Sequence, residues 1–176
     1  MRVMAPFTID HEPTLFGLLC IRDHDVTRWR LEKPNDYLRF LTYQWDLGEP
    51  FVNVEHDVEF SAGTVEELAD CERDWCWCPY EGVTDPQLPH LGMTKFSARF
   101  IEATHSAWDD FMATSEVIRL QWQRQPTWSM LDGYLFRYAT GRGQLAHRHE
   151  RTVVNRRPEG VERMADDSMA GFLHGA

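Results

Sequence analysis

The chain has 176 residues and a formal net charge of -10, from 18 Lys and Arg against 28 Asp and Glu. This length suits one domain. A hydrophobic fraction of 43% and a mean hydropathy of -0.49 exclude a membrane-spanning or intrinsically disordered chain. The negative charge disfavours nonspecific binding to a polyanion such as duplex DNA, although the stretch from Arg142 to Arg157 is locally basic and could dock a partner.

The sequence indicates a reducing compartment. Its cysteines, Cys20, Cys71, Cys76 and Cys78, are too few for a disulfide scaffold. No secretory pattern and no apolar run long enough to span a bilayer is present. We therefore expect a cytoplasmic protein with one compact domain over residues 1–165 and a flexible tail over 166–176. The oligomeric state is not readable from the sequence.

Helices and strands are predicted to alternate along the chain. A strand at Val3–Ala5 precedes an apolar segment of uncertain type, Thr14–Cys20, and a helix from Pro34 to Gly48. We then expect a strand at 51–54, a short helix from a Thr64–Glu67 capping box, a strand at 74–78, helices around 96–101 and after Ser106, a strand at 118–122, a helix at 129–140 and an extended segment at 144–154. This alternation favours an α/β sandwich with a mainly parallel sheet.

Two acids follow the apolar strand 51–54. In an open α/β sheet, ligands bind beyond the carboxyl ends of the strands. Glu55 and Asp57 alternate along the chain, so an extended backbone would direct both to one side, about 7 Å apart. Such a pair can hold Mg²⁺ or Mn²⁺ together with substrate phosphates. The alternative is a hydrated acidic strand end.

Two histidines and a third acid are further candidates. His147 and His149 are also two residues apart and could bind a metal from one strand face, or both could be surface histidines. Asp132 lies among apolar neighbours at a predicted helix start. It could be a general base, strengthened by partial removal from water, or an acid that merely favours the helix dipole.

The cysteines allow two interpretations. Cys71, Cys76 and Cys78 could form a zinc site with His90, but the last two are more typical of small buried apolar residues. Trp75 and Trp77 would then occupy the opposite strand face, as core or as a stacking platform for a sugar or base. Dinucleotide-binding, P-loop, nucleophile-elbow and H-E-x-x-H motifs are all absent from the sequence.

The segment VNVEHDVEF resembles the metal-binding strand of GT-A-fold glycosyltransferases, where an apolar strand ends in D-x-D or E-x-D. The segments DWCWCPY, LGMTKFSARFI, WSMLDGYLF and HRH follow in the order seen in small glycosyltransferase-like proteins of actinobacteria and their phages, over residues 1–155. The resemblance implies a GT-A-like, Rossmann-like α/β sandwich with a mainly parallel mixed sheet. It also implies a nucleotide-sugar donor bound through Mn²⁺ or Mg²⁺.

The resemblance also implies roles for individual residues. Asp57 would be the principal metal ligand, and Glu55 would contact the metal or the donor ribose. His147 or His149 would complete the metal shell, and Asp132 would activate the hydroxyl group of an unidentified acceptor. Polar groups of the donor and acceptor pocket would come from Thr94 and Ser97.

Two other classes of function stay open. The same acids and histidines could serve a metal-dependent hydrolase or nucleotidyltransferase. A noncatalytic interaction module on a degenerate transferase fold would carry the same pattern without the chemistry.

Overall fold

A computed structural model of the chain describes residues 1–33, 36–61, 63–81, 89–122 and 129–156. The predicted tail at 166–176 and the end of the basic stretch at Arg157 lie outside these residues. The elements are β1 (Arg2–Phe7), α1 (Glu12–Leu19), β2 (Asp25–Arg30), α2 (Asp36–Leu47), β3 (Phe51–Val54), β4 (Val58–Glu59), α3 (Thr64–Asp70), β5 (Trp75–Trp77), β6 (Met93–Phe96), α4 (Ala98–Ala103), α5 (Ala107–Trp122), α6 (Ser129–Thr140), β7 (His147–Arg148) and β8 (Val154–Asn155).

Six of the strands form one sheet in the order β2-β1-β3-β6-β5-β7. The pairs β1·β2, β1·β3 and β5·β7 are parallel, whereas β6 is antiparallel to both β3 and β5. Strands β4 and β8 pair separately and antiparallel. The predicted α/β sandwich with a mainly parallel mixed sheet is therefore confirmed.

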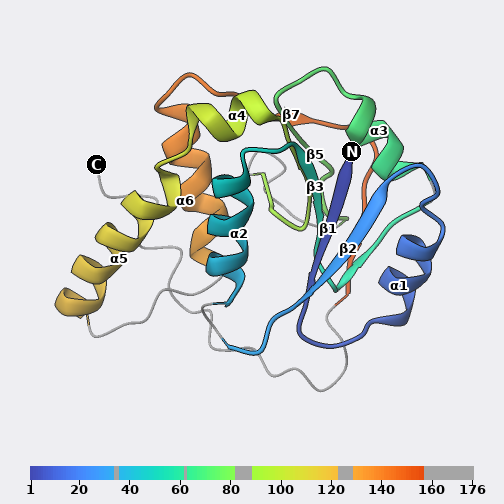
Figure 1. Cartoon of the computed structure of the whole chain (residues 1–176), viewed down its shortest axis with the longest axis horizontal. Coiled ribbons are helices and arrows are strands. Elements are labelled where there is room, and N and C mark those ends of the chain that lie inside the picture. Colours follow the sequence, from blue (N-terminus) through green and yellow to red (C-terminus); the bar gives the residue numbers. More distant parts are fainter. Residues whose placement is uncertain (34–35, 62, 82–88, 123–128, 157–176) are drawn as a thin grey trace.

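Each face of the sheet is covered by helices (Figure 1). On one side lie α2, α4, α5 and α6, over an aromatic core that includes Trp45, Phe51, Trp75, Phe96 and Phe100. On the other side lie α1 and α3, over a smaller aliphatic core that includes Val52, Val54, Leu68, Cys76 and Met93. Because side chains alternate along a strand, β3 supplies Phe51 to the first core and Val52 to the second.

Several predicted elements are confirmed. α2 ends at Leu47, and Gly48 follows with φ +67°, a conformation that glycine adopts without strain. β3 covers 51–54 and α6 covers 129–140, as predicted.

Other element predictions are wrong. The strand at 118–122 is the last part of α5, because a helix that starts at Ala107 continues with no glycine or proline to end it. Phe96 belongs to strand β6, and the helix begins only after Ser97. Thr64 is not the N-cap of its helix, because Gly63 holds that position.

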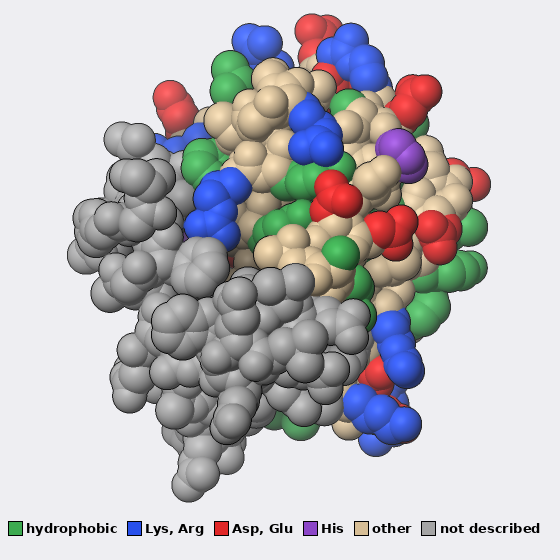
Figure 2. Space-filling view, turned by 90° about the vertical axis from the view of Figure 1, so that its left-hand side faces the viewer, with side chains coloured by type: hydrophobic (Ala, Val, Ile, Leu, Met, Phe, Trp, Pro, Cys, Tyr) green, Lys and Arg blue, Asp and Glu red, His purple; other side chains and the backbone are tan. Residues whose placement is uncertain are grey.

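One face of the molecule is mixed in charge where the structure describes it. The face on the α5 side carries acidic and basic side chains interspersed with one another (Figure 2). Among the described residues, no helix has the length and apolar character required to cross a bilayer.

Candidate functional site

Three carboxylates gather near the carboxyl end of β3. The strand ends at Val54, and the chain turns at once, with the Val58 N–H donating to the Glu55 carbonyl at 3.3 Å. Glu55 and Asp57 therefore lie in a turn and do not continue the strand, so the alternation that the sequence suggested does not apply here. The charges of Asp57 and Asp132 both act on Glu55. The structure thus places Asp57 and Asp132 within electrostatic reach of Glu55.

Glu55 is held by two tyrosine hydroxyls. The Tyr37 hydroxyl, on α2, donates to Glu55 Oε1 at 2.5 Å, and the Tyr80 hydroxyl is also hydrogen bonded to this carboxyl group. Asn53 Nδ2 donates to the Tyr37 oxygen at 3.0 Å and to the Leu91 carbonyl at 2.6 Å. A chain of hydrogen bonds therefore fixes Glu55 from the buried strand outward.

Glycine at position 92 makes this arrangement possible. The Glu55 N–H donates to the Gly92 carbonyl at 2.8 Å, so the two backbones run close together. The Tyr80 hydroxyl fills the space that a Cβ at Gly92 would need. A larger residue would push Tyr80 away from Glu55.

The surroundings change the acidity of Glu55. Burial raises its pKa to about 8, and the nearby Asp132 and Asp57 charges add to this effect, whereas the hydrogen bonds from Tyr37 and Tyr80 oppose it. Burial and the same acid also raise the pKa of both tyrosines well above the ordinary value, so both phenols keep their protons at neutral pH. Near neutral pH, Glu55 holds a proton unless a cation takes its place.

Asp57 has the features of a cation ligand. Its side chain is half-buried, and its Oδ1 atom is inaccessible to water and has no hydrogen-bond partner among the residues that the structure describes. A buried carboxylate oxygen without a partner is costly. Hard carboxylate oxygens suit Mg²⁺ or Mn²⁺, which need only one or two of them besides water and phosphate oxygens. The donor set therefore fits the predicted cation.

Asp132 lies in the first turn of α6 and is fixed from the loop before β6. Its Oδ1 accepts from the Leu91 N–H at 3.2 Å, and its Oδ2 lies 3.8 Å from His90 Nδ1. His90 stacks on Tyr80 with ring centroids 4.8 Å apart, which orients the imidazole. The Asp132 side chain keeps 31% of its surface exposed, so it can reach a substrate.

The two late histidines lie together but away from these acids. Their rings are 5.0 Å apart, which confirms that residues two apart share a face here. His149 Nδ1 donates to Glu67 Oε1 on α3 at 2.8 Å, and its ligand atoms lie near those of Cys71 and Cys76. His147 is exposed on the edge strand. In the described part of the chain, no contact joins either histidine to Asp57.

The residues suggested for the donor and acceptor pocket lie in the interior or cap a helix. Trp75 and Trp77 are 1% and 2% exposed, and Trp75 packs against Phe100 at 5.0 Å in the aromatic core. Thr94 is fully buried and donates to the His90 carbonyl. Ser97 accepts from the Phe100 N–H at 3.0 Å as the N-cap of α4 and donates to Asp74.

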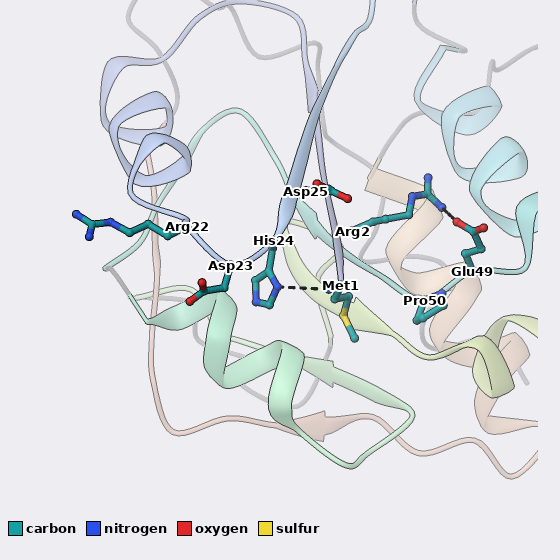
Figure 3. Close-up of a pocket in the computed structure, with 8 residues that line it drawn as sticks. All are labelled: Met1, Arg2, Arg22, Asp23, His24, Asp25, Glu49 and Pro50. Carbon is teal, nitrogen blue, oxygen red and sulfur yellow. Dashed lines mark hydrogen bonds and ion pairs between the residues drawn. The ribbon is translucent and has the colours of Figure 1, made fainter.

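An open depression of about 490 Å³ lies elsewhere (Figure 3). It is lined by Met1, Arg2, Arg22, Asp23, His24, Asp25, Glu49 and Pro50. These residues stand at the amino ends of β1 and β2 and before β3, opposite to the carboxylates. An ion pair of 2.9 Å between Arg2 and Glu49 already neutralises part of its wall. We therefore place the candidate site at the carboxyl end of β3.

The fold is a mixed α/β sandwich, and the candidate site is an acidic cluster that directly follows the central strand β3. The chain is similar in structure to a glycosyltransferase involved in the glycosylation of the major capsid of PBCV-1, with TM-score 0.49 and 11% identity over 84% of this chain and 81% of the other. It is also similar to A197 from STIV, with TM-score 0.38 and 14% identity over 58% and 68% of the two chains. Neither a protein-family model nor a curated protein matches the sequence.

Sequence reasoning missed Tyr37, Tyr80 and Asn53, and it considered His90 only as a zinc ligand. The phenols are ordinary core residues by pattern, and nothing in their spacing connects them to Glu55. A usable signal was Gly92, since a glycine between the buried residues Leu91 and Met93 marks a close approach of another group.

Proposed function

We propose that this protein is a glycosyltransferase that moves a sugar from a nucleoside diphosphate to a hydroxyl acceptor with the help of Mn²⁺ or Mg²⁺. The observation that carries the proposal is the buried, unpartnered Oδ1 of Asp57 in the turn directly after β3, beside Glu55 and Asp132. The resemblance of VNVEHDVEF to the metal-binding strand of GT-A-fold enzymes supports the same role.

Asp57, assisted by Glu55, would hold the cation. A bound divalent cation neutralises the charge that develops on a departing diphosphate. Glu55 would lose its proton when the cation binds, because both cannot occupy the carboxylate. The tyrosine hydroxyls on Glu55 then keep the carboxylate oriented.

Asp132 would take the proton of the acceptor hydroxyl. The Leu91 N–H donates to Oδ1 of Asp132 and fixes that oxygen, whereas Oδ2 faces His90. The Asp132 side chain is partly exposed, so an acceptor hydroxyl can approach it. A carboxylate positioned in this way acts as a general base when the hydroxyl lies within hydrogen-bond reach. His90 Nδ1 lies 3.8 Å from Asp132 Oδ2, so the imidazole would border the acceptor hydroxyl's position.

The test measures nucleotide binding and transfer separately. Thermal unfolding with Mn²⁺ and a panel of nucleoside diphosphates should show a shift of about 5 to 10 °C for one base at about 100 times its dissociation constant. Asp57→Asn should abolish this shift, whereas Asp109→Asn, the same change on an exposed acid of α5, should not. Asp132→Asn should keep the shift and lose transfer.

The products distinguish the alternatives. Release of a nucleoside diphosphate from a nucleotide sugar supports glycosyl transfer, whereas release of pyrophosphate from a nucleoside triphosphate would indicate a nucleotidyltransferase. A folded Asp57→Asn protein with full metal-dependent binding would refute the metal assignment. No shift with any nucleotide and metal would favour an interaction module.

A further inference from the structure

A second cluster of metal-binding side chains lies on the α3 side of the sheet. The ligand atoms of Cys71, Cys76 and His149 all lie within 4.8 Å of one another, and among the described residues no other group of three or more potential ligands is this close. They come from different elements: Cys71 follows α3, Cys76 is on β5, and His149 follows β7. We propose that these three side chains form a zinc-binding site, separate from the acidic site after β3.

The tautomer of His149 leaves a ligand atom available. Arg151 Nε donates to Glu67 Oε2 at 2.7 Å, and a carboxylate in such an ion pair can only accept hydrogen bonds. His149 Nδ1 therefore carries the proton that it donates to Glu67 Oε1 at 2.8 Å. Nε2 of the neutral imidazole then has a free lone pair. A carboxylate behind a ligating histidine is the usual support for zinc.

His149 Nε2 is also an unexplained buried atom. The side chain is 9% exposed, and Nε2 has no hydrogen-bond partner in the described part of the protein. A buried imidazole nitrogen without a partner is costly unless a ligand binds it. This observation is independent of the cysteine geometry and points to a bound ion.

The two sulfurs are already close. Cys71 Sγ and Cys76 Sγ lie 2.8 Å apart, too far for a disulfide bond at about 2.05 Å. A tetrahedral zinc ion with Zn–S bonds of about 2.3 Å holds two sulfurs about 3.8 Å apart, so binding requires them to separate by about 1 Å. The Cys71 side chain is only half-buried, so rotation of the side chain can supply this movement while its backbone stays in place.

A buried lysine stabilises the loop that carries Cys71. Lys95 is 4% exposed, and its ammonium group donates to the backbone carbonyls of Cys71 and Arg73. This contact fixes the loop from the central strand β6 and places a positive charge near the sulfurs. Thiolate and imidazole ligands together favour Zn²⁺ over Mg²⁺ or Mn²⁺. Binding would release the two thiol protons, and water would supply a fourth ligand.

Direct measurement of the metal tests the proposal on the intact chain. Protein purified under reducing conditions should contain about one equivalent of zinc, measured by inductively coupled plasma mass spectrometry. Replacement by Co²⁺ should produce a thiolate-to-cobalt charge-transfer band in the near ultraviolet. Less than a tenth of an equivalent, or a cobalt spectrum without that band, would overturn the site.

Variants identify the ligands. Cys76→Ser and His149→Ala should lose zinc, whereas Cys78→Ser should keep it, because Cys78 is buried directly after β5 but is not one of the three ligands. Glu67→Gln should weaken zinc binding by about 10- to 100-fold, measured by chelator competition. Equal loss of zinc in Cys78→Ser would show a folding effect and overturn the assignment. A protein mass lower by two hydrogens under reducing conditions would reveal a Cys71–Cys76 disulfide and would also overturn it.

The two metal sites can be distinguished. Asp57→Asn should keep zinc and lose Mn²⁺-dependent nucleotide binding, so loss of the acidic site does not by itself remove zinc. Zinc without nucleotide binding would refute the proposed transferase function alone.

Discussion

The clearest energetic consequence of the site is a dependence of stability on pH. The pKa of Glu55 is about 8 in the folded protein, against an ordinary value of 4.5. A group with a raised folded pKa contributes stability that is complete below the ordinary value and is lost as the pH rises toward the folded value. Between about pH 4.5 and pH 8 the loss approaches 1.36 kcal/mol per pH unit, and the whole difference is on the order of 5 kcal/mol.

Glu55→Gln removes this titration and keeps the shape of the protonated carboxyl group. We expect the free energy of unfolding of the wild type to fall by several kcal/mol between pH 5 and pH 8, and the variant to lack this part of the decrease. Urea unfolding followed by tryptophan fluorescence in the presence of a chelator measures both curves. His56, whose pKa burial lowers, titrates in both proteins with the opposite sign, so the difference between the curves isolates Glu55.

The control is Glu102→Gln, the same substitution on an exposed residue of α4. It should change neither the free energy of unfolding nor its dependence on pH. Parallel curves for wild type and Glu55→Gln between pH 6 and pH 8 would refute the reasoning, because they would show that Glu55 has the same pKa in the folded and unfolded chain.

Three further substitutions test the packing of the site, a helix cap and the aromatic core by urea unfolding. Gly92→Ala should cost about 1 to 3 kcal/mol because the new Cβ meets the Tyr80 hydroxyl, and a neutral result would show that Tyr80 is not fixed there. Ser97→Ala should cost about 1 kcal/mol through loss of the α4 cap, and no change would exclude that role. Phe96→Ala should cost about 3 to 5 kcal/mol as a cavity opens beside Trp45, and a loss below about 1 kcal/mol would contradict a closely packed aromatic core.

The sequence predicts the parts of the fold where local pattern and burial agree. The run at Phe51–Val54 is uniformly apolar except for Asn53, and it forms the buried central strand that leads into the acids. The helix that ends before Gly48 is signalled by its apolar spacing and by the glycine. In both cases most of the apolar residues that form the pattern are buried in the core of the protein.

The misses have physical causes. β2 at Asp25–Arg30 is an edge strand with mostly exposed polar residues, so its sequence has no apolar alternation to detect. β6 contains Lys95, which looks like a surface residue until two backbone carbonyls more than 20 positions away satisfy its ammonium group. Long-range contacts of this kind are invisible to a pattern that reads neighbours in sequence.

The same distinction applies to the site. Glu55 and Asp57 could be selected because they directly follow a strand, but Tyr37 and Tyr80 reach Glu55 from a helix and a loop. The sequence suggests His90 as the metal ligand beside the cysteines, whereas the parallel pairing of β5 with β7 brings His149 to them. Strand order decides which histidine is near, and composition does not.

One segment connects the two clusters. After His149, the Val153 N–H donates to the Pro79 carbonyl at 3.0 Å, and the Arg156 N–H donates to the Asp57 carbonyl at 2.9 Å. The backbone that carries a zinc ligand at one end therefore supports the turn of the proposed cation ligand at the other. Since β7 pairs with the sheet over only two residues, the Cys71–Cys76–His149 cluster is well placed to hold this segment against the sheet. The zinc ion would in this way help to position Asp57 without taking part in sugar transfer.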